Sequence, residues 1–173
     1  MKEYAKRLLA ALLLSCCLCS LFSCGSESGT PAGSEEGQPK EPVTLSAIYD
    51  AVTAAVPDAD KLTDVQESYL SGFLKASPED FSGYRIVTQS VSTSVDEIGI
   101  FEAKNAEDIA KIEAMIDTFF EFRLAIWDPK YLEAEFPKLQ NAQRVTSGNY
   151  VMYLILSDDA RAAAVTAFEN ITK

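Results

Sequence analysis

The sequence predicts an α+β fold, arranged as a two-layer sandwich of helices on a sheet. Two groups of β-rich residues can each form a hairpin, and each hairpin is followed by residues with the apolar spacing of a helix. Because hairpins and helices occur in separate groups, an antiparallel or mixed sheet is favoured over a parallel one. The expected order is α-α-β-β-α-α-β-β-α, within a single domain over residues 45–173.

Residues 1–23 have the pattern of an export signal. A basic start precedes an apolar run that is too short for a comfortable membrane-spanning helix. The run ends in the tetrad Leu21-Phe22-Ser23-Cys24, which resembles the bacterial lipobox, although Phe22 is bulkier than usual at its position. We therefore expect cleavage before Cys24 and attachment of a lipid to its thiol, which would hold the protein at the membrane.

Two alternatives to lipidation at Cys24 remain open. Cys24 can be one more apolar residue beside the other cysteines of the signal, and Leu14-Ser15-Cys16 is a rival site. The residues after Cys16 are still apolar and would make a poor free N-terminus, so Cys24 is preferred. Since no cysteine follows Cys24, the mature domain has no disulfide, thiolate nucleophile or cysteine-rich metal site.

Residues 24–44 are expected to form a flexible tether. Residues 25–44 contain four Gly, three Pro and three Ser but no aromatic residue, so they cannot bury enough apolar surface to fold. As a flexible coil this segment would span roughly 25 Å. Glu35 and Glu36 lie in it, and a solvated spacer is the preferred interpretation of this pair over a catalytic one.

Charge and composition exclude several classes of function. The net charge is −11, and loss of residues 1–23 removes three bases and one acid, which makes it −13. So acidic a surface repels phosphate backbones, so no nucleic-acid partner is expected. It also repels anionic lipid head groups, so the body should stand off the membrane that its lipid anchor enters. Histidine is absent, which removes imidazole bases, His-containing triads and His metal sites.

The first half of the domain is expected to hold two helices and a hairpin. Residues 45–52 have apolar side chains at helical spacing, and Pro57 ends this helix; a second helix is expected over residues 64–74. Residues 84–91 and 95–103 are rich in β-formers and are expected to pair. Because the second of these strands has apolar residues on both faces, we expect an interior strand that is covered at least partly on each side.

The second half begins with the clearest helical pattern in the chain. Asn105 can cap a helix that starts at Ala106. Apolar residues follow a three-four spacing that Phe119 and then Arg123 continue. The aromatic-rich end could line a ligand pocket, but core packing is the preferred interpretation. The remaining elements are a short helix over 131–139 interrupted at Pro137, strands over 143–147 and 150–156 with a Gly-based turn, and a helix after residue 159.

Two blocks of the chain resemble a known family. They are "VDEIGIFEAKNAEDIAKI", with Glu97-Ile98 entering a strand and Phe101 ending it, and "GNYVMYLILSDD", with Gly148-Asn149-Tyr150 opening a late strand. They look like the signature blocks of a family of small bacterial lipoproteins catalogued as domain of unknown function 4358. The resemblance covers about the last 80 residues well and residues 45–90 loosely. It implies a surface lipoprotein and no particular activity.

Few acidic residues are candidates for a catalytic or metal-binding role. Asp96 and Glu97 are neighbours on a strand, so they point to opposite faces and cannot converge on one substrate atom. Glu97 beside a core strand could be a buried acid with a raised pKa, but a structural pairing with Lys, Arg or a backbone amine is preferred. Asp158 and Asp159 precede a helix, where helix capping is preferred over metal binding. We expect no catalytic residue, no metal and no cofactor.

A weak candidate surface for a ligand or partner is formed by Trp127, Tyr131 and Glu97. Trp127 and Tyr131 could stack on a sugar ring or a peptide, although an aromatic plug over the edge of the core is the preferred interpretation.

The function expected from these features is that of an extracytoplasmic, lipid-anchored protein that is not an enzyme. It would be a binding or assembly module whose partner is an envelope protein or a small ligand. Two alternatives remain open. A carboxylate-dependent envelope hydrolase would need two carboxylates that converge in a cleft, and an inhibitor-like protein would bind its partner through a sheet edge, as in strand addition.

Overall fold

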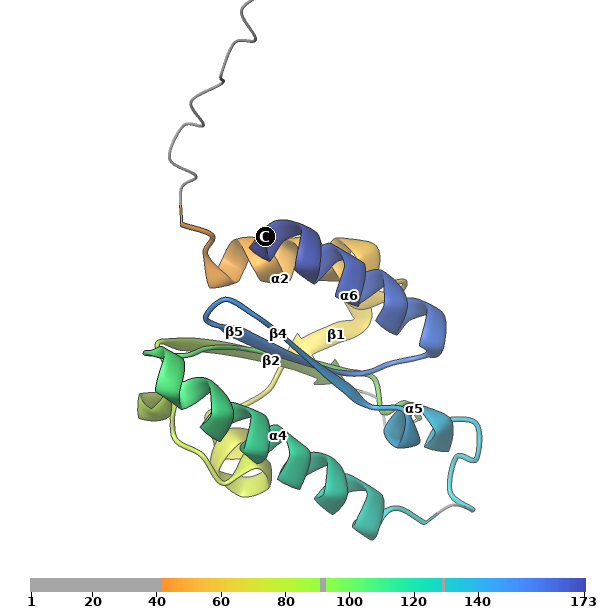
Figure 1. Ribbon diagram of the computed structural model, residues 1–173. Coiled ribbons are helices and arrows are strands. Elements are labelled where there is room, and N and C mark those ends of the chain that lie inside the picture. Colours follow the sequence, from red (N-terminus) through yellow and green to blue (C-terminus); the bar gives the residue numbers. More distant parts are fainter. Residues whose placement is uncertain (1–41, 91–92, 129) are drawn as a thin grey trace, which may run out of the picture. The chain divides into compact units, whose positions relative to one another are not determined.

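The structure is a computed structural model that describes residues 42–90, 93–128 and 130–173. The expected export signal (residues 1–23), the expected lipidation site Cys24 and nearly all of the expected tether lie outside the described residues. The described residues form a five-stranded antiparallel sheet with helices on both of its faces (Figure 1). No helix among these residues is long and apolar enough to cross a membrane.

The order of strands across the sheet places the most apolar strands at its centre. β3 pairs with β2 on one side and with β5 on the other, and five of its six residues are buried. The expectation of an interior strand is therefore confirmed. Across the sheet the strands are β1 (Leu62–Asp64), β2 (Gly83–Gln89), β3 (Glu97–Glu102), β5 (Tyr150–Ile155) and β4 (Gln143–Ser147).

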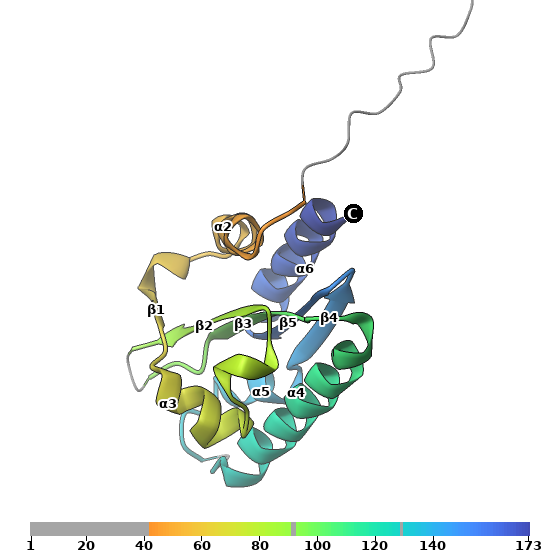
Figure 2. The ribbon, with the colours of Figure 1, turned by 90° about the vertical axis from the view of Figure 1, so that its left-hand side faces the viewer.

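Helices cover the two faces of the sheet in separate groups (Figure 2). α2 and α6 pack against each other on one face, and α4, α5 and the α3–η2 segment cover the other. The bounds are α2 (Leu45–Ala55), η1 (Ala59–Lys61), α3 (Glu67–Tyr69), the π-helical η2 (Leu70–Leu74), η3 (Pro78–Asp80), α4 (Ala106–Ile126), α5 (Phe136–Gln140) and α6 (Asp158–Thr172).

The α+β class is confirmed and the order of elements is roughly as expected, but the layers number three rather than two. Along β3, Ile98 and Ile100 point into the core under α2 and α6, whereas Phe101 points into the core under α4. A strand that is apolar on both faces is stable only when both faces are covered, because each exposed apolar face would remain in contact with water.

Two local expectations are also corrected. The helix expected over residues 64–74 begins later, because Leu62–Asp64 pairs with β2 as an edge strand and the helical turns start only at Glu67. The helix expected over residues 131–139 is shorter and starts at Phe136. Pro137 lies in its first turn, where a missing N–H is tolerated, so this proline helps to start the helix rather than to interrupt it.

α4 forms as its sequence predicts. The Asn105 side chain accepts hydrogen bonds from the backbone N–H groups of Glu107 and Asp108, at 3.0 and 3.2 Å. These bonds satisfy donors that the first helical turn leaves without a partner. The buried residues of α4 follow the expected stripe, and they are Ile112, Ile116 and Phe119. This stripe fixes which side of α4 faces the sheet.

Candidate functional site

Glu97 is completely buried and is the only charged residue in the buried class among the described residues. It lies at the start of β3, on the face that α4 covers, because it alternates with Ile98 along the strand. An unpaired carboxylate in such a place would lose several kcal/mol of hydration, so its partners decide whether the fold is stable.

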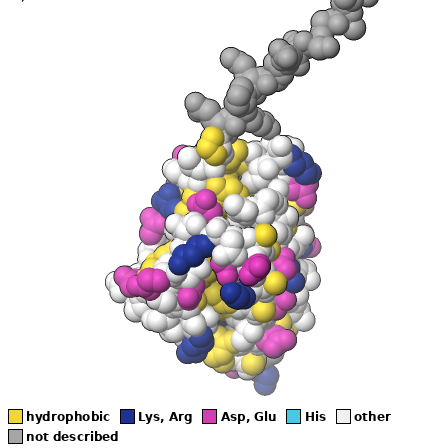
Figure 3. Space-filling model, turned by 60° about the vertical axis from the view of Figure 1, so that its left-hand side comes forward, with side chains coloured by type: hydrophobic (Ala, Val, Ile, Leu, Met, Phe, Trp, Pro, Cys, Tyr) yellow, Lys and Arg dark blue, Asp and Glu magenta, His cyan; other side chains and the backbone are white. Residues whose placement is uncertain are grey.

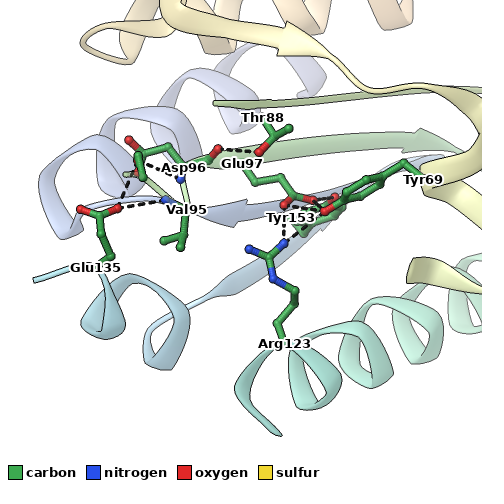
Figure 4. Close-up of polar contacts among 9 residues, drawn as sticks. Tyr69, Thr88, Val95, Asp96, Glu97, Arg123, Glu135 and Tyr153 are labelled. Atoms are coloured by element: carbon green, nitrogen blue, oxygen red, sulfur yellow. Dashed lines mark hydrogen bonds and ion pairs between the residues drawn. The ribbon is translucent and has the colours of Figure 1, made fainter. Parts of the chain in front are cut away.

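Three side chains from three other elements meet Glu97 (Figure 4). The Arg123 guanidinium donates from Nη1 to Oε2 of Glu97 at 2.7 Å. The Tyr69 hydroxyl lies 2.9 and 2.8 Å from the two carboxylate oxygens, and the Tyr153 hydroxyl donates to Oε1. Arg123 also donates to the Tyr69 hydroxyl at 3.1 Å. We call Tyr69, Glu97, Arg123 and Tyr153 the Glu97 cluster.

A glycine makes room for one member of the Glu97 cluster. Gly99 is directly opposite Tyr153 in the register of β3 and β5. A Cβ at Gly99 would lie only 2.0 Å from Cε1 of Tyr153, so the phenol ring occupies the space that a side chain would fill. The ring thus lies across β3 and carries its hydroxyl to Glu97, two residues away along the strand.

The charges of the Glu97 cluster are set by burial and by the carboxylate. Burial, and then the negative charge of Glu97, raises the pKa of both the Tyr69 and the Tyr153 hydroxyls well above the usual range. Burial alone would lower the pKa of Arg123, but the charge and hydrogen bond of Glu97 together with the two tyrosines outweigh it, and the pKa is raised. Both phenols therefore stay neutral donors, and the guanidinium stays charged. The arrangement ties α3, α4, β3 and β5 together.

A second polar cluster holds the segment before β3 against α5. Lys138 Nζ donates to Asp96 at 2.8 Å and to Glu135 at 2.9 Å. Glu135 also accepts from the backbone N–H of Val95 at 3.0 Å and from the Ser94 hydroxyl at 3.1 Å. Burial would raise the pKa of Glu135, but the hydrogen bonds from Lys138, Val95 and Ser94 and the charge of Lys138 together outweigh it, so the pKa is lowered.

Replacing Glu135 with glutamine is expected to lower the free energy of unfolding by about 1 kcal/mol at neutral pH, because hydrogen bonds to a charged group are lost. The pKa of Glu135 is lower in the folded chain than its ordinary value of 4.5. Its contribution is therefore present above that ordinary value and disappears as the pH falls through the folded pKa. Urea unfolding at several pH values should show the difference between Glu135→Gln and the wild type shrinking on acidification.

The control for this prediction is Glu133→Gln, which removes the same charge from an exposed position two residues earlier. This variant should unfold like the wild type at every pH. A deficit of Glu135→Gln that stayed constant between neutral and acid pH would contradict the stated role of its carboxylate.

The structure places the expected site residues in different surroundings. Glu97 is inside the core and is not part of a surface, and it makes a structural pairing of the kind expected for it, with Arg123. Trp127 packs against the core under α4, and its ring centroid is 5.9 Å from that of Tyr131. The indole Nε1 of Trp127 is buried without a hydrogen-bond partner among the described residues. Tyr131 is exposed.

Asp158 and Asp159 lie in the first turn of α6. Asp158 accepts from Arg161 at 2.7 Å and from Asn141 at 3.3 Å. Among the residues that the structure describes, no group of three or more Asp, Glu, His or Cys side chains is arranged to hold a metal ion.

Sequence reasoning did not find a groove between the α3–η2 segment and α4. Two hollows of about 230 and 430 Å³ lie along one side of α4, and Lys75, Lys111 and Met115 line both. Opposite α4, the larger hollow is lined by η2, and the smaller one by the segment that follows η2, with Ala76, Asp80 and Phe81. The signal was the aromatic-rich end of α4. Phe119 is buried as expected, but Phe122, one turn later, is 41% exposed and lines the larger hollow.

The chain is thus a small α+β domain that neutralises a buried carboxylate within its own core and presents a groove on one helical layer. Comparison with known protein families shows to which family the chain belongs. A family profile described as "Domain of unknown function (DUF4358)" matches residues 54–156, which is more than half of the chain, and the chain belongs to this family. The match includes the whole Glu97 cluster and the groove. No curated protein matches, and no solved structure matches.

Proposed function

We propose that this protein is a lipid-anchored, extracytoplasmic binding or assembly module without catalytic activity. The observation that carries the proposal is the state of Glu97. Both of its oxygens accept hydrogen bonds from the domain's own side chains, and none of its surface is exposed. The acid best placed for chemistry therefore stabilises the fold, which leaves the molecular surface to carry the function.

The pairing of other acids favours a binding module over a carboxylate-dependent hydrolase. Such an enzyme needs two carboxyl groups about 5–9.5 Å apart on either side of the bond that is cleaved. Here Asp96 is paired with Lys138, and Asp158 is paired with Arg161, each at an N–O distance below 3 Å. Each of these carboxylates already has a cationic partner, as Glu97 has in Arg123.

The order of the strands determines where a partner could bind by adding a strand to an edge of the sheet. In the first hairpin, β3 pairs with a strand on both sides, and β2 pairs with β1 over residues 87–89. The outermost strands of the sheet are β1, which has three residues, and β4. The Arg144 side chain of β4 is engaged with Asp117 of α4 at 2.7 Å. These features favour a partner surface on the helices over one on the first hairpin.

The anchor is tested by labelling with radioactive palmitate in the organism that encodes the protein. We expect wild-type protein to incorporate the label and Cys24→Ala to lose it completely, because the thiol that accepts the lipid is gone. Cys16→Ala is the matched control for the rival site and should be labelled like the wild type. Equal labelling of Cys24→Ala, or loss of label from Cys16→Ala, would contradict anchoring at Cys24.

A further inference from the structure

The groove between the α3–η2 segment and α4 follows one side of α4 over several turns. The smaller hollow is lined from Asp108 to Met115, and the larger one continues from Lys111 to Phe122. The two hollows are adjacent, because they share Lys75 on one wall and Lys111 and Met115 on the other, and we treat them together as one groove. At 1.5 Å per residue, the stretch of α4 from Asp108 to Phe122 is about 20 Å long. This length fits roughly four turns of a helix laid alongside.

Two exposed aromatic rings from different elements stand at one end of the groove. Phe73 of η2 is 40% exposed and Phe122 of α4 is 41% exposed, and their ring centroids are 6.1 Å apart. Met115 lines both hollows, and it lies between these two rings and the other end of the groove. Aromatic residues and methionine are enriched where proteins contact one another, and methionine adapts its shape to different partners. In Figure 3, apolar side chains reach the surface in the lower part of the molecule, between basic and acidic ones.

The charged residues of the larger hollow are basic although the chain is acidic overall, whereas the smaller hollow is also lined by Asp80 and Asp108. The larger hollow has two charged lining residues among the described ones, Lys75 and Lys111, on a chain of net charge −11. Lys111 is paired with Asp108 at 2.7 Å. Lys75 donates to the carbonyl of Gly72 at 2.7 Å and has no ion pair within the described residues.

The backbone at Lys75 is itself unusual. Its φ is +56°, a left-handed conformation at the end of η2, where glycine is the usual residue. A residue with a Cβ is strained in this conformation. Such strain is typical of positions where the side chain serves a function, and here it places an ammonium group beside an apolar groove.

We infer that this groove holds an amphipathic helix of a partner protein, with apolar residues against Met115, Phe73 and Phe122 and a carboxylate against Lys75. This inference rests on the proposed function as a binding module. A helix laid in a groove between helical walls keeps its polar face in water. A small ligand would instead need a cavity that encloses most of its surface, whereas the two phenylalanine rings remain open to solvent.

The start of the domain leaves the groove free. The hydroxyl of Tyr150 donates to the carbonyl of Val43 at 2.6 Å, and Val43 packs against the core under α2 and α6. The chain therefore enters the domain on the face of the sheet opposite α4 (Figure 1). A partner can reach the groove without displacing the first described residues.

The experiment is photo-crosslinking in intact cells with the full chain. A photoreactive amino acid, p-benzoylphenylalanine, replaces Thr118, which lines the larger hollow. The matched control position is Thr166 on α6. Both threonines are exposed on helices, and each donates its hydroxyl to the carbonyl four residues earlier, at 2.9 Å. The crosslinked segment is then identified by mass spectrometry of the product.

We expect a product from position 118 and none from position 166. Its crosslinked segment should have apolar residues at helical spacing and at least one acidic residue. Lys75→Glu should reduce the yield by roughly tenfold, because it places like charges in contact, while Lys61→Glu, an exposed lysine on η1, should leave the yield unchanged. Circular dichroism of each variant verifies that it is folded.

Each of the other outcomes would contradict a part of this proposal. A crosslink to a second copy of this chain, to lipid, or to a segment without acidic residues would refute the assigned occupant. A product from position 166 but not from 118 would refute the groove while it leaves the binding module standing. Absence of product from both positions would contradict the groove as the binding surface; the palmitate experiment tests the anchor separately.

Discussion

Replacing Arg123 with methionine is expected to lower the free energy of unfolding by about 3–5 kcal/mol. The physical reason is that Glu97 would stay completely buried while it loses its positive partner, which now lies 2.7 Å away. Two tyrosine hydroxyls would remain as donors to the carboxylate, but neutral donors do not replace a buried opposite charge. Methionine keeps an apolar stem of similar length, so most of the packing on Phe119 should survive.

Urea unfolding measures this effect, with Arg144→Met as the matched control. Arg144 also pairs with two acids, Glu113 and Asp117, but it is about one-third exposed. Its loss should therefore change the free energy of unfolding by less than about 1 kcal/mol. In the double variant Glu97→Gln/Arg123→Met, part of the stability should return because no charge is left buried. A loss below about 1 kcal/mol for Arg123→Met alone would show that the Glu97 cluster does not hold the fold together.

Replacing Gly99 with alanine is expected to destabilise the domain by about 2–4 kcal/mol. The added Cβ would lie 2.0 Å from the ring of Tyr153, which is completely buried. The ring must move, and its hydroxyl then leaves Glu97. Two effects therefore combine: overpacking in the core, and a hydrogen bond lost from a buried carboxylate.

Gly72→Ala is the control for this second prediction, because a Cβ at Gly72 meets no atom within 4 Å. We expect this variant to be as stable as the wild type, or slightly more stable through its higher helix propensity. In a double-mutant cycle of Gly99→Ala with Tyr153→Leu, the two losses should not add, since the smaller leucine leaves room for the new methyl group. Additive losses would mean that contact with Tyr153 is not the reason for the glycine.

Parts of the Glu97 cluster could be predicted from local patterns. Arg123 continues the apolar stripe of α4, and a charged residue on a buried stripe indicates a buried partner. Glu97 stands at the head of a strand that is apolar on both faces, which indicates burial. What no local pattern revealed is that these two residues, 26 positions apart, are partners of each other. Tyr69 and Tyr153 looked like ordinary residues of a helix and a strand.

The groove shows a different limit of sequence reasoning. Phe119 and Phe122 both belong to the aromatic-rich end of α4, for which the sequence favours core packing. Only the position of the α3–η2 segment beside α4 decides that Phe119 is covered while Phe122 stays open. That position depends in turn on β1, whose pairing with β2 delays the start of the helical turns to Glu67.

The sequence alone determined the order of most helices and strands, the cap of α4, the acidic charge and the absence of thiols after Cys24. These properties depend on residues that are close together in the chain, so spacing and composition are sufficient to predict them. The tertiary structure alone decided which helices cover each face of the sheet, that Glu97 meets Arg123, and that a groove opens beside Lys75. These contacts join distant residues, and they exist only where the folded backbone brings their elements together.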